Sequence, residues 1–417
     1  MFNKTILPNG IRIITEALPH SKVVAVGVWI DVGSRDEHDL NSGSAHFVEH
    51  MLFKGTGKRS AREIARELDV LGGSANAFTS RENTCLHATV MVSKLPILVE
   101  LFTDLLADSL FAEEEIERER QVILQEINMV EDMPDDHIHD LFAALLWGQH
   151  PLGKTILGSQ EIVAAMDSRK LREYVQKYYT TDKIVVAAAG NVEHAAFVTL
   201  WQKAFDKFGQ TADPGLARIE PRPLPASRKL YAKPLEQVHI VLGAYGLSII
   251  DADRFGYLLL NVLLGGNMSS RLFQEIREKR GLAYSIYSYI ASYSDSGYLA
   301  IYLGVDKESV NESLALIAKE ISMLKKTPVT ETELANARDF VKSGLFLSME
   351  SMEAIMTRIA RNEIYFGKYI PLAEVIDSID RVSAEDIRRL SRKVFGRKEL
   401  TLAGLGSLEE TGIGWKS

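Results

Sequence analysis

The chain of 417 residues contains a second copy of part of itself, and this repeat constrains the fold more than any other feature. The segment LREYVQKYYTTDKIVVAAAGNVE, which starts at Leu171, resembles IRRLSRKVFGRKELTLAGLGSLE, which starts at Ile387, 216 positions later (387 minus 171). Each copy has the pattern of an amphipathic helix, a polar turn, an apolar strand and a glycine. At the same spacing, the strand around Val24 matches the strand around Ile240. Two matches in one register predict two halves with the same fold.

A proline-rich segment separates the two halves. The stretch DPGLARIEPRPLPASRK, residues 213–229, contains four prolines and no apolar period, which indicates an extended linker. We therefore predict an N-terminal domain over residues 1–212 and a C-terminal domain over residues 230–417. In both halves, β-branched strands are mixed with helices of 3.6-residue period, so the residues indicate an α+β or α/β fold.

One predicted helix has clear signals at both ends. Ser60 and Glu63 have the spacing of a capping box at the start of a helix. An apolar stripe runs from Ile64 to Leu71, and Gly72 follows it directly. Because glycine ends helices readily, we expect the helix to stop there.

Composition and charge exclude several classes of protein. Hydrophobic residues make up 46% and charged residues 25% of the chain, which is typical of a protein folded throughout. The net charge of -8 and the absence of a Lys/Arg run argue against nucleic acid or an anionic membrane as a partner. No stretch approaches ~18 consecutive apolar residues, so we expect no membrane span.

The first residues and the single cysteine indicate the cellular compartment of the protein. The start, MFNKTILPNGIRIITE, lacks the pattern of a signal or transit peptide. Cys85 is the only cysteine, which rules out an intramolecular disulfide and a cysteine-based zinc site. We expect Cys85 to be a buried thiol in a strand, and the protein to be cytoplasmic.

The segment SGSAHFVEHMLFKG, residues 42–55, carries the pattern H-x-x-E-H. Capping serines at its start, a glycine at its end and no internal proline predict a helix. In a helix His46 and His50 lie one turn and about 40° apart, so both imidazoles can reach one ion. Glu49 lies about 60° to the other side of His46, where a carboxylate can contact water on the metal. This order of residues is a zinc protease motif.

A catalytic zinc site needs a third protein ligand. The helix predicted over residues 113–132 places Glu119 and Glu126 on the same face as its apolar stripe. Carboxylates on a buried face are costly unless a cation compensates them. That cation can be Arg118 or Arg120 at the helix edge, or it can be a metal ion. Beside an H-x-x-E-H helix, we favour the metal.

This combination of residues resembles the pitrilysin, insulysin and mitochondrial processing peptidase family of zinc metallopeptidases, in its short two-domain form. Glu126 lies 76 positions after His50 (126 minus 50), and Glu119 precedes it by seven. The segment GGSANAFTSRENT from Gly72 is similar to the substrate-pairing edge strand of the family. The segment REKRGLAYSIYS from Arg277 is similar to its arginine-tyrosine substrate motif. With the duplicated halves, the resemblance covers essentially the whole chain.

The resemblance implies a fold and a set of roles. The fold is α+β, with two homologous domains that are each a mainly antiparallel sheet packed with helices. His46, His50 and Glu126 become ligands of Zn2+, Glu49 becomes the catalytic base, and Glu119 becomes a carboxylate that orients a ligand.

The resemblance also implies substrate contacts in both halves. Asn76 and Ala77 pair with the substrate backbone, while Arg277 and Tyr284 hold the substrate from the second half. Taken alone, Arg277 and Tyr284 are better explained as residues of a solvated surface, and only the seven-residue spacing that they share with the family favours a substrate role. Leu86 and His87 stand where many relatives have aromatic residues, so the substrate preference stays open.

The second half lacks zinc ligands. The counterparts of the H-x-x-E-H residues, 216 positions later, are Val262, Gly265 and Gly266, so we expect no zinc there. In relatives this glycine-rich loop lies near the substrate path, although its glycines are also explained by backbone conformation alone. The loop has neither a dinucleotide-binding spacing nor a P-loop lysine.

Two further histidines, His137 and His139, follow a proline in an acidic stretch. In a helix their side chains differ in direction by about 200°, so they cannot converge on one ion. We expect both to be surface residues.

Together these features predict a zinc-dependent metalloendopeptidase that hydrolyses extended peptides or unfolded segments inside a chamber, with water activated by the metal as nucleophile. Relatives that divide the work put zinc on one chain and the glycine-rich loop on another. This chain has both, so the resemblance implies a homodimer. The alternative is a non-catalytic assembly or presequence-binding subunit, as some relatives are, but such chains lose a ligand or the base. We expect no nucleic acid and no membrane as partners.

Overall fold

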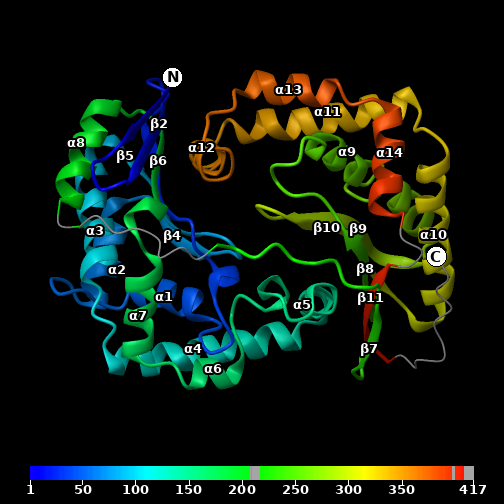
Figure 1. Cartoon of the computed structure of the whole chain (residues 1–417), viewed down its shortest axis with the longest axis horizontal. Coiled ribbons are helices and arrows are strands. Elements are labelled where there is room, and N and C mark those ends of the chain that lie inside the picture. Colours follow the sequence, from blue (N-terminus) through cyan, green and yellow to red (C-terminus); the bar gives the residue numbers. More distant parts are fainter. Residues whose placement is uncertain (207, 209–216, 397–399, 408–417) are drawn as a thin grey trace. The chain divides into compact units, whose positions relative to one another are not determined.

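Two compact units make up the part of the chain that the structure describes. The computed structural model describes residues 1–206, 208, 217–396 and 400–407. Each unit is assembled from three separate stretches of sequence and contains one sheet packed with helices (Figure 1). The first unit consists of Met1–Met129, Lys154–Arg218 and Phe346–Ile370, and the second of Val130–Gly153, Ile219–Leu345 and Pro371–Ser417.

The sheet of the first unit has six strands in the order β1-β2-β6-β3-β5-β4. Their bounds are β1 (Phe2–Ile6), β2 (Arg12–Ala17), β6 (Ile184–Gly190), β3 (Val23–Ile30), β5 (Thr84–Met91) and β4 (Ser74–Thr79). Only β2 and β6 run parallel, and the other neighbours are antiparallel. Strand β4 lies at the edge, so one side of its backbone is left open for another strand.

Helices cover both faces of this sheet. Strands β3 and β6 are buried on both faces, which explains their nearly continuous apolar sequences VVAVGVWI and IVVAAAG. On one face the core is shared with α1 (Ser44–Leu52), α2 (Ala61–Leu71), α3 (Leu95–Asp108), α4 (Glu113–Asp132), α6 (Gln160–Ala164), α7 (Ser168–Tyr178) and α8 (His194–Phe205). The other face packs against α12 (Met352–Phe366), which is orange in Figure 1.

Small residues on the sheet make room for α12. The buried side of this helix carries Met356, whose sulfur accepts a hydrogen bond of 3.3 Å from the Trp29 indole. A Cβ atom added at Gly27 would lie 2.5 Å from that sulfur. A larger side chain at position 27 would therefore displace the helix.

The sheet of the second unit has five strands in the order β7-β11-β8-β10-β9. Their bounds are β7 (Arg228–Ala232), β11 (Thr401–Gly406), β8 (Val238–Tyr245), β10 (Gly297–Val305) and β9 (Ala283–Ser292). One face shares a core with α9 (Arg254–Leu264), α10 (Val310–Lys326), α11 (Glu331–Ser348), α13 (Leu372–Asp380) and α14 (Ala384–Val394). The other face packs against α5 (Pro134–Trp147).

The two sheets repeat one design, as the internal repeat predicts. In each, the strand that ends the repeated segment pairs in parallel with one neighbour and antiparallel with the other. The preceding helices, α7 and α14, have equal lengths and begin 216 positions apart (384 minus 168). Gly190 and Gly406 end the equivalent strands with φ of 125° and 145°, a backbone conformation that favours glycine. The predicted α+β fold with two sheet-and-helix domains is confirmed.

A helix from the opposite half of the sequence covers one face of each sheet. Helix α5 lies in the N-terminal half of the chain but packs on β8 and β11 of the second unit. Helix α12 lies in the C-terminal half but packs on β2, β3 and β6 of the first unit. The sequence pattern did not indicate this exchange. The boundaries at residues 212 and 230 remain a prediction.

Several local predictions can be compared directly with the structure. Helix α2 follows Ser60, which forms the predicted capping box with Glu63, and it ends at Gly72 with φ of 68°. Cys85 is a buried free thiol, as expected.

Of the predicted linker, residues 213–216 lie outside the described residues, residues 217–227 form neither helix nor strand, and β7 begins at the next residue. No helix in the described part of the chain is long and apolar enough to cross a membrane.

Candidate metal centre

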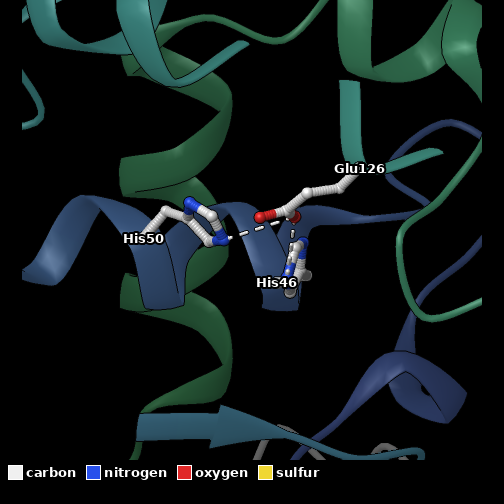
Figure 2. A group of neighbouring side chains, drawn as sticks. All are labelled: His46, His50 and Glu126. Carbon is white, nitrogen blue, oxygen red and sulfur yellow. Dashed lines mark ion pairs between the residues drawn. The ribbon is translucent and has the colours of Figure 1, made fainter. Parts of the chain in front are cut away.

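Three side chains of the first unit converge on one point. His46 and His50 project from α1 and Glu126 from α4, and one ligand atom of each lies within 4.8 Å of the others (Figure 2). The Nε2 atoms of both histidines lie 3.7 Å from the same oxygen, Oε2 of Glu126. Within residues 1–206, 208, 217–396 and 400–407, this is the one group of three or more such side chains close enough to share a metal ion.

A buried carboxyl group, rather than a serine, fixes the start of α1. The N-cap residue is Gly43, with φ of 90°, and no side chain of the segment caps the helix, so the predicted serine cap is wrong. Instead Glu37 accepts hydrogen bonds from the backbone N–H groups of Gly43 and Ala45, at 2.8 and 2.7 Å. Burial raises the pKa of Glu37 to about 8, although these two bonds oppose the rise. The helix that carries both histidines is thus anchored at its first turn.

The predicted helix over residues 113–132 is confirmed as α4, but its arginines do not compensate Glu119. Arg118 and Arg120 each pair with another glutamate of α4, three residues earlier in the chain. Oε2 of Glu119 lies 3.0 Å from Nδ1 of His50, and Oε1 lies 2.7 Å from Nζ of Lys54. Glu119 therefore contacts Nδ1 of His50, the ring nitrogen that faces away from Glu126 in Figure 2.

Glu49 lies beside the cluster and is held by the edge strand. The hydroxyl of Thr79, the last residue of β4, donates a hydrogen bond of 2.5 Å to Oε2 of Glu49. Burial raises the pKa of Glu49, whereas the Thr79 bond and the charge of His50 lower it. The charge of Glu126 raises it further. A carboxylate whose pKa is shifted toward neutrality suits proton transfer at neutral pH.

Sequence reasoning missed Thr79, although a signal for it exists. Side chains alternate along a strand, so Thr79 lies on the same face of β4 as Ala77. That face belongs to the core that also contains α1. The alternation therefore directs a hydroxyl from β4 toward the H-x-x-E-H helix.

Asn76 and Ala77 lie on β4, the edge strand of the first sheet. Both belong to β4, opposite His87 and Leu86 of β5. The backbone N–H of Ala77 donates to the Asn76 side chain at 2.9 Å. On the face of the sheet that packs against α12, His87 contacts Glu353 of that helix, with Nδ1 and Oε1 3.2 Å apart. The Ala77 amide is thus bound by the side chain of the residue before it.

Arg277 and Tyr284 lie together in the second unit. Arg277 lies on the π-helical turn η5 (Phe273–Glu278), and Tyr284 lies near the start of β9. The guanidinium carbon is 5.7 Å from the centre of the Tyr284 ring and 4.9 Å from that of Phe273. Tyr284 is 77% exposed, which leaves its hydroxyl available to a ligand.

The second half places no ligands at the positions that correspond to the H-x-x-E-H residues. Val262 is buried in α9, Gly265 follows the last residue of that helix, and Gly266 comes next. The second unit contains no metal-binding group among its described residues.

The prediction that His139 is a surface residue is wrong. Its Nδ1 lies 2.7 Å from the hydroxyl of Tyr289, and its Nε2 lies 3.0 Å from that of Tyr287. Burial lowers its pKa. The reason is the exchange of helices, which packs α5 on the second sheet and turns an apparently exposed side chain toward the tyrosines of β9.

The cluster in the first unit fits zinc. Two imidazoles and one carboxylate form a donor set of catalytic zinc sites. Neighbouring ligands of tetrahedral zinc lie ~3.4 Å apart when each bond is ~2.1 Å, and the Nε2 to Oε2 distances of 3.7 Å are close to that value. Burial and the His50 charge lower the pKa of His46 to about 4, so its ring is neutral at neutral pH, as a ligand must be.

The fold and this cluster define a class of protein with two similar α+β units and a His-His-Glu cluster in the first. Residues 12–160 match the family described as insulinase (peptidase family M16), and residues 165–341 match the one described as peptidase M16 inactive domain. An uncharacterised zinc protease of Streptomyces coelicolor is 39% identical over 98% of this chain and 90% of its own length. One of Bacillus subtilis is 40% identical over 95% of this chain and 96% of its own. The chain belongs to peptidase family M16, the insulinase family, and the resemblance read from the sequence is confirmed.

Two solved structures have the same fold. A protease from Helicobacter pylori superimposes with a TM-score of 0.91 at 23% identity, over 97% of this chain and 99% of that one. A peptidase M16 inactive domain from Pseudomonas fluorescens superimposes with a TM-score of 0.89 at 20% identity, over 98% of both chains. At such identities these likenesses establish the fold alone.

Proposed function

We propose that the chain is a zinc-dependent endopeptidase in which His46, His50 and Glu126 bind the metal. The observation that carries this proposal is the convergence of both Nε2 atoms on one oxygen of Glu126, from two separate helices. A metal ion bound between these three side chains would compensate the Glu126 carboxylate and accept a lone pair from each imidazole. The names of the relatives, which are zinc proteases, support the same metal.

Glu49 carries the proton in the proposed reaction. Zinc bound at the cluster supplies a Lewis acid, which acidifies water and polarises a peptide carbonyl. The Glu49 carboxylate takes a proton from the attacking water and later gives it to the leaving amine. The hydrogen bond from the Thr79 hydroxyl holds this carboxylate in place beside the metal ligands. Glu119 orients His50 through Nδ1.

The proposed substrates are extended peptides or unfolded segments of proteins. An extended chain can add as a further strand to the open edge of β4 and pair with the backbone of Asn76 and Ala77. The Asn76 side chain must then release the Ala77 amide. Arg277 and Tyr284, which contact each other, are proposed to hold the substrate from the second unit. We further propose a cytoplasmic homodimer that encloses the reaction in a chamber.

The test compares wild type with Glu49→Gln and with Glu114→Gln, which changes an exposed glutamate of α4. Zinc bound per chain is measured by elemental analysis, and turnover with an internally quenched extended peptide. Wild type and Glu114→Gln should bind one zinc and cleave the peptide. Glu49→Gln should keep its zinc and lose turnover by on the order of 10³-fold.

The outcome separates the proposal from its alternative. Equal cleavage by wild type and Glu49→Gln would remove Glu49 as the base. If none of the three proteins binds zinc or cleaves, the chain is instead a non-catalytic assembly or presequence-binding subunit. A chelator should abolish turnover of the wild type, and added zinc should restore it.

A further inference from the structure

We propose that Lys54 is a positioning residue of the zinc site, which acts through Glu119 on His50. The inference rests on the proposed zinc site. It assigns a role to a side chain that touches no metal ligand and that the H-x-x-E-H motif does not contain. In this role, Lys54 fixes the carboxylate that fixes the imidazole, and so sets how tightly the chain binds zinc.

The contacts form a continuous chain from Lys54 to the metal ligands. Nζ of Lys54 lies 2.7 Å from Oε1 of Glu119, and Oε2 of the same carboxylate lies 3.0 Å from Nδ1 of His50. Nε2 of His50 then lies 3.7 Å from Oε2 of Glu126. Each oxygen of Glu119 has its own partner, so the carboxylate cannot rotate without losing one of them.

This arrangement determines which nitrogen of His50 faces the metal. A carboxylate accepts but does not donate, so the neutral His50 ring must carry its proton on Nδ1 to bond Glu119. Nε2 is then the unprotonated nitrogen, with its lone pair directed toward Glu126. A partner that fixes the tautomer and orientation of a ligating histidine raises metal affinity.

Lys54 supplies the charge that lets Glu119 occupy this position. The Glu119 side chain is only 8% exposed, and burying a lone carboxylate is unfavourable unless a cation compensates it. The arginines of α4 do not serve, because they pair with other glutamates. Among the described residues, Lys54 is the one lysine or arginine in contact with the Glu119 carboxylate.

Hydrogen bonds hold the backbone on both sides of Lys54, so its side chain starts from a fixed position when it contacts Glu119. Lys54 comes two residues after the end of α1, and its N–H donates to the Met51 carbonyl at 3.1 Å. The next residue, Gly55, has φ of 120°, which turns the chain sharply away from the helix. The Gly55 carbonyl accepts a hydrogen bond of 3.0 Å from Leu110, just after α3.

The two histidines differ in whether Nδ1 has a hydrogen-bond partner. Nδ1 of His46 is buried and has no hydrogen-bond partner in the described part of the chain. Only His50 is oriented by a second residue, so the effect of Lys54 on zinc must pass through Glu119 and His50. A double-mutant cycle can isolate that route.

The experiment measures the Kd for zinc by competition with a chelating dye, in the full chain at pH 7.5. The cycle consists of wild type, Lys54→Met, Glu119→Ala and the double variant. Lys54→Met should weaken zinc binding about tenfold, and Glu119→Ala by 10- to 100-fold, roughly the range for residues that orient ligands. The double variant should bind zinc no more weakly than Glu119→Ala alone.

Two further variants separate positioning from general effects. Lys54→Arg keeps the charge and should restore most of the affinity. Lys58→Met removes a lysine four residues further along the chain, which contacts Asp104 instead, with Nζ and Oδ1 3.3 Å apart, and this variant should bind zinc like wild type. Urea unfolding of each metal-free protein shows whether a variant has lost its fold.

Three results would overturn the inference. Wild-type affinity in Lys54→Met would show that the contact is unimportant. Equal losses from Lys54→Met with and without Glu119 would show that Lys54 does not act through that carboxylate. If wild type itself bound no zinc, the proposed function would fail and the inference with it, whereas zinc binding without coupling would leave the proposed function intact.

Discussion

Three carboxylates near the metal centre have distinct surroundings, and these decide what each can do. Glu49 is partly buried and accepts a hydrogen bond from Thr79. Glu119 is held by a lysine and a histidine. Glu126 is 33% exposed and accepts no hydrogen bond in the described part of the chain, so its oxygens are available to an ion. One residue type thus supplies a base, a support and a ligand in the proposed site.

The Thr79 contact predicts a selective loss of turnover. Thr79→Val keeps the shape of the side chain but removes the hydroxyl that donates to Glu49. Without that bond the carboxylate is held less firmly, so kcat should fall about tenfold, while zinc content stays at the wild-type level. Thr79→Ser restores the donor and should recover most of kcat. Loss of zinc from Thr79→Val would contradict this prediction, because the residue would then support the metal rather than the base.

The buried cap of α1 predicts a dependence of stability on pH. Burial raises the pKa of Glu37 from an ordinary 4.5 to about 8, so folding favours the protonated carboxyl. The stability that this group contributes is complete below about pH 4.5 and is lost as the pH rises through about 8. Linkage gives a loss of about 3 kcal/mol between pH 5 and pH 8.

Glu37→Gln provides the comparison, because the amide does not titrate. The free energy of unfolding of metal-free wild type and variant is measured in urea at pH 5 and pH 8. Wild type should lose about 3 kcal/mol more than Glu37→Gln over this interval. Parallel pH dependences of the two proteins would show that Glu37 does not titrate with a raised pKa.

The elements show which local signals in the sequence were sufficient. The ends of α2 were predicted because Ser60, Glu63 and Gly72 all act on their own helix. Helix α4 was predicted over its whole length by its apolar period. The cap of α1 was not, because Glu37 is six residues from Gly43 and no local spacing relates them. Lys54 and Thr79 were missed for the same reason, since their partners lie on other elements.

The glycine at the start of α1 should be more sensitive to substitution than the glycine at the end of α2. A Cβ at Gly43 would lie 2.6 Å from the carbonyl oxygen of Leu157, and its φ of 90° is unfavourable for other residues. A Cβ at Gly72 would meet nothing closer than 4.0 Å, although φ is 68°. Gly43→Ala should therefore cost about 3 kcal/mol and Gly72→Ala about 1 kcal/mol in urea unfolding. Equal costs would mean that the contact with Leu157 relaxes freely.

At the scale of the whole molecule, the repeat predicted two similar sheets but not the exchange of helices. The spacing of 216 relates strands and helices that have the same neighbours in both sheets. Helices α5 and α12 are amphipathic, and periodicity shows that each has a buried face but not which sheet covers it. His139 was misjudged for that reason, because its environment is set by a distant strand.

The exchange predicts that the N-terminal half of the sequence is unstable by itself. A fragment of residues 1–212 lacks α12, so one face of its sheet is uncovered, and it carries α5 without the sheet on which α5 packs. Adding a peptide of residues 346–370 should raise the thermal midpoint of the fragment. A peptide with Met356→Asp and Ile359→Asp, which places charges on the buried side of α12, should have no effect. An equally stable fragment without any peptide would contradict the proposed dependence on α12.

The order of synthesis gives this exchange a cost in the cell. Strand β6 ends at Gly190 and α12 ends at Phe366, so the first sheet is complete long before its second cover exists. At ~5–20 residues per second, roughly 10 to 35 s of translation separate the two. During that interval the nascent chain exposes an apolar surface that attracts chaperones and other nascent chains. Chains that are released from ribosomes stalled between the end of β6 and the end of α12 should therefore be degraded.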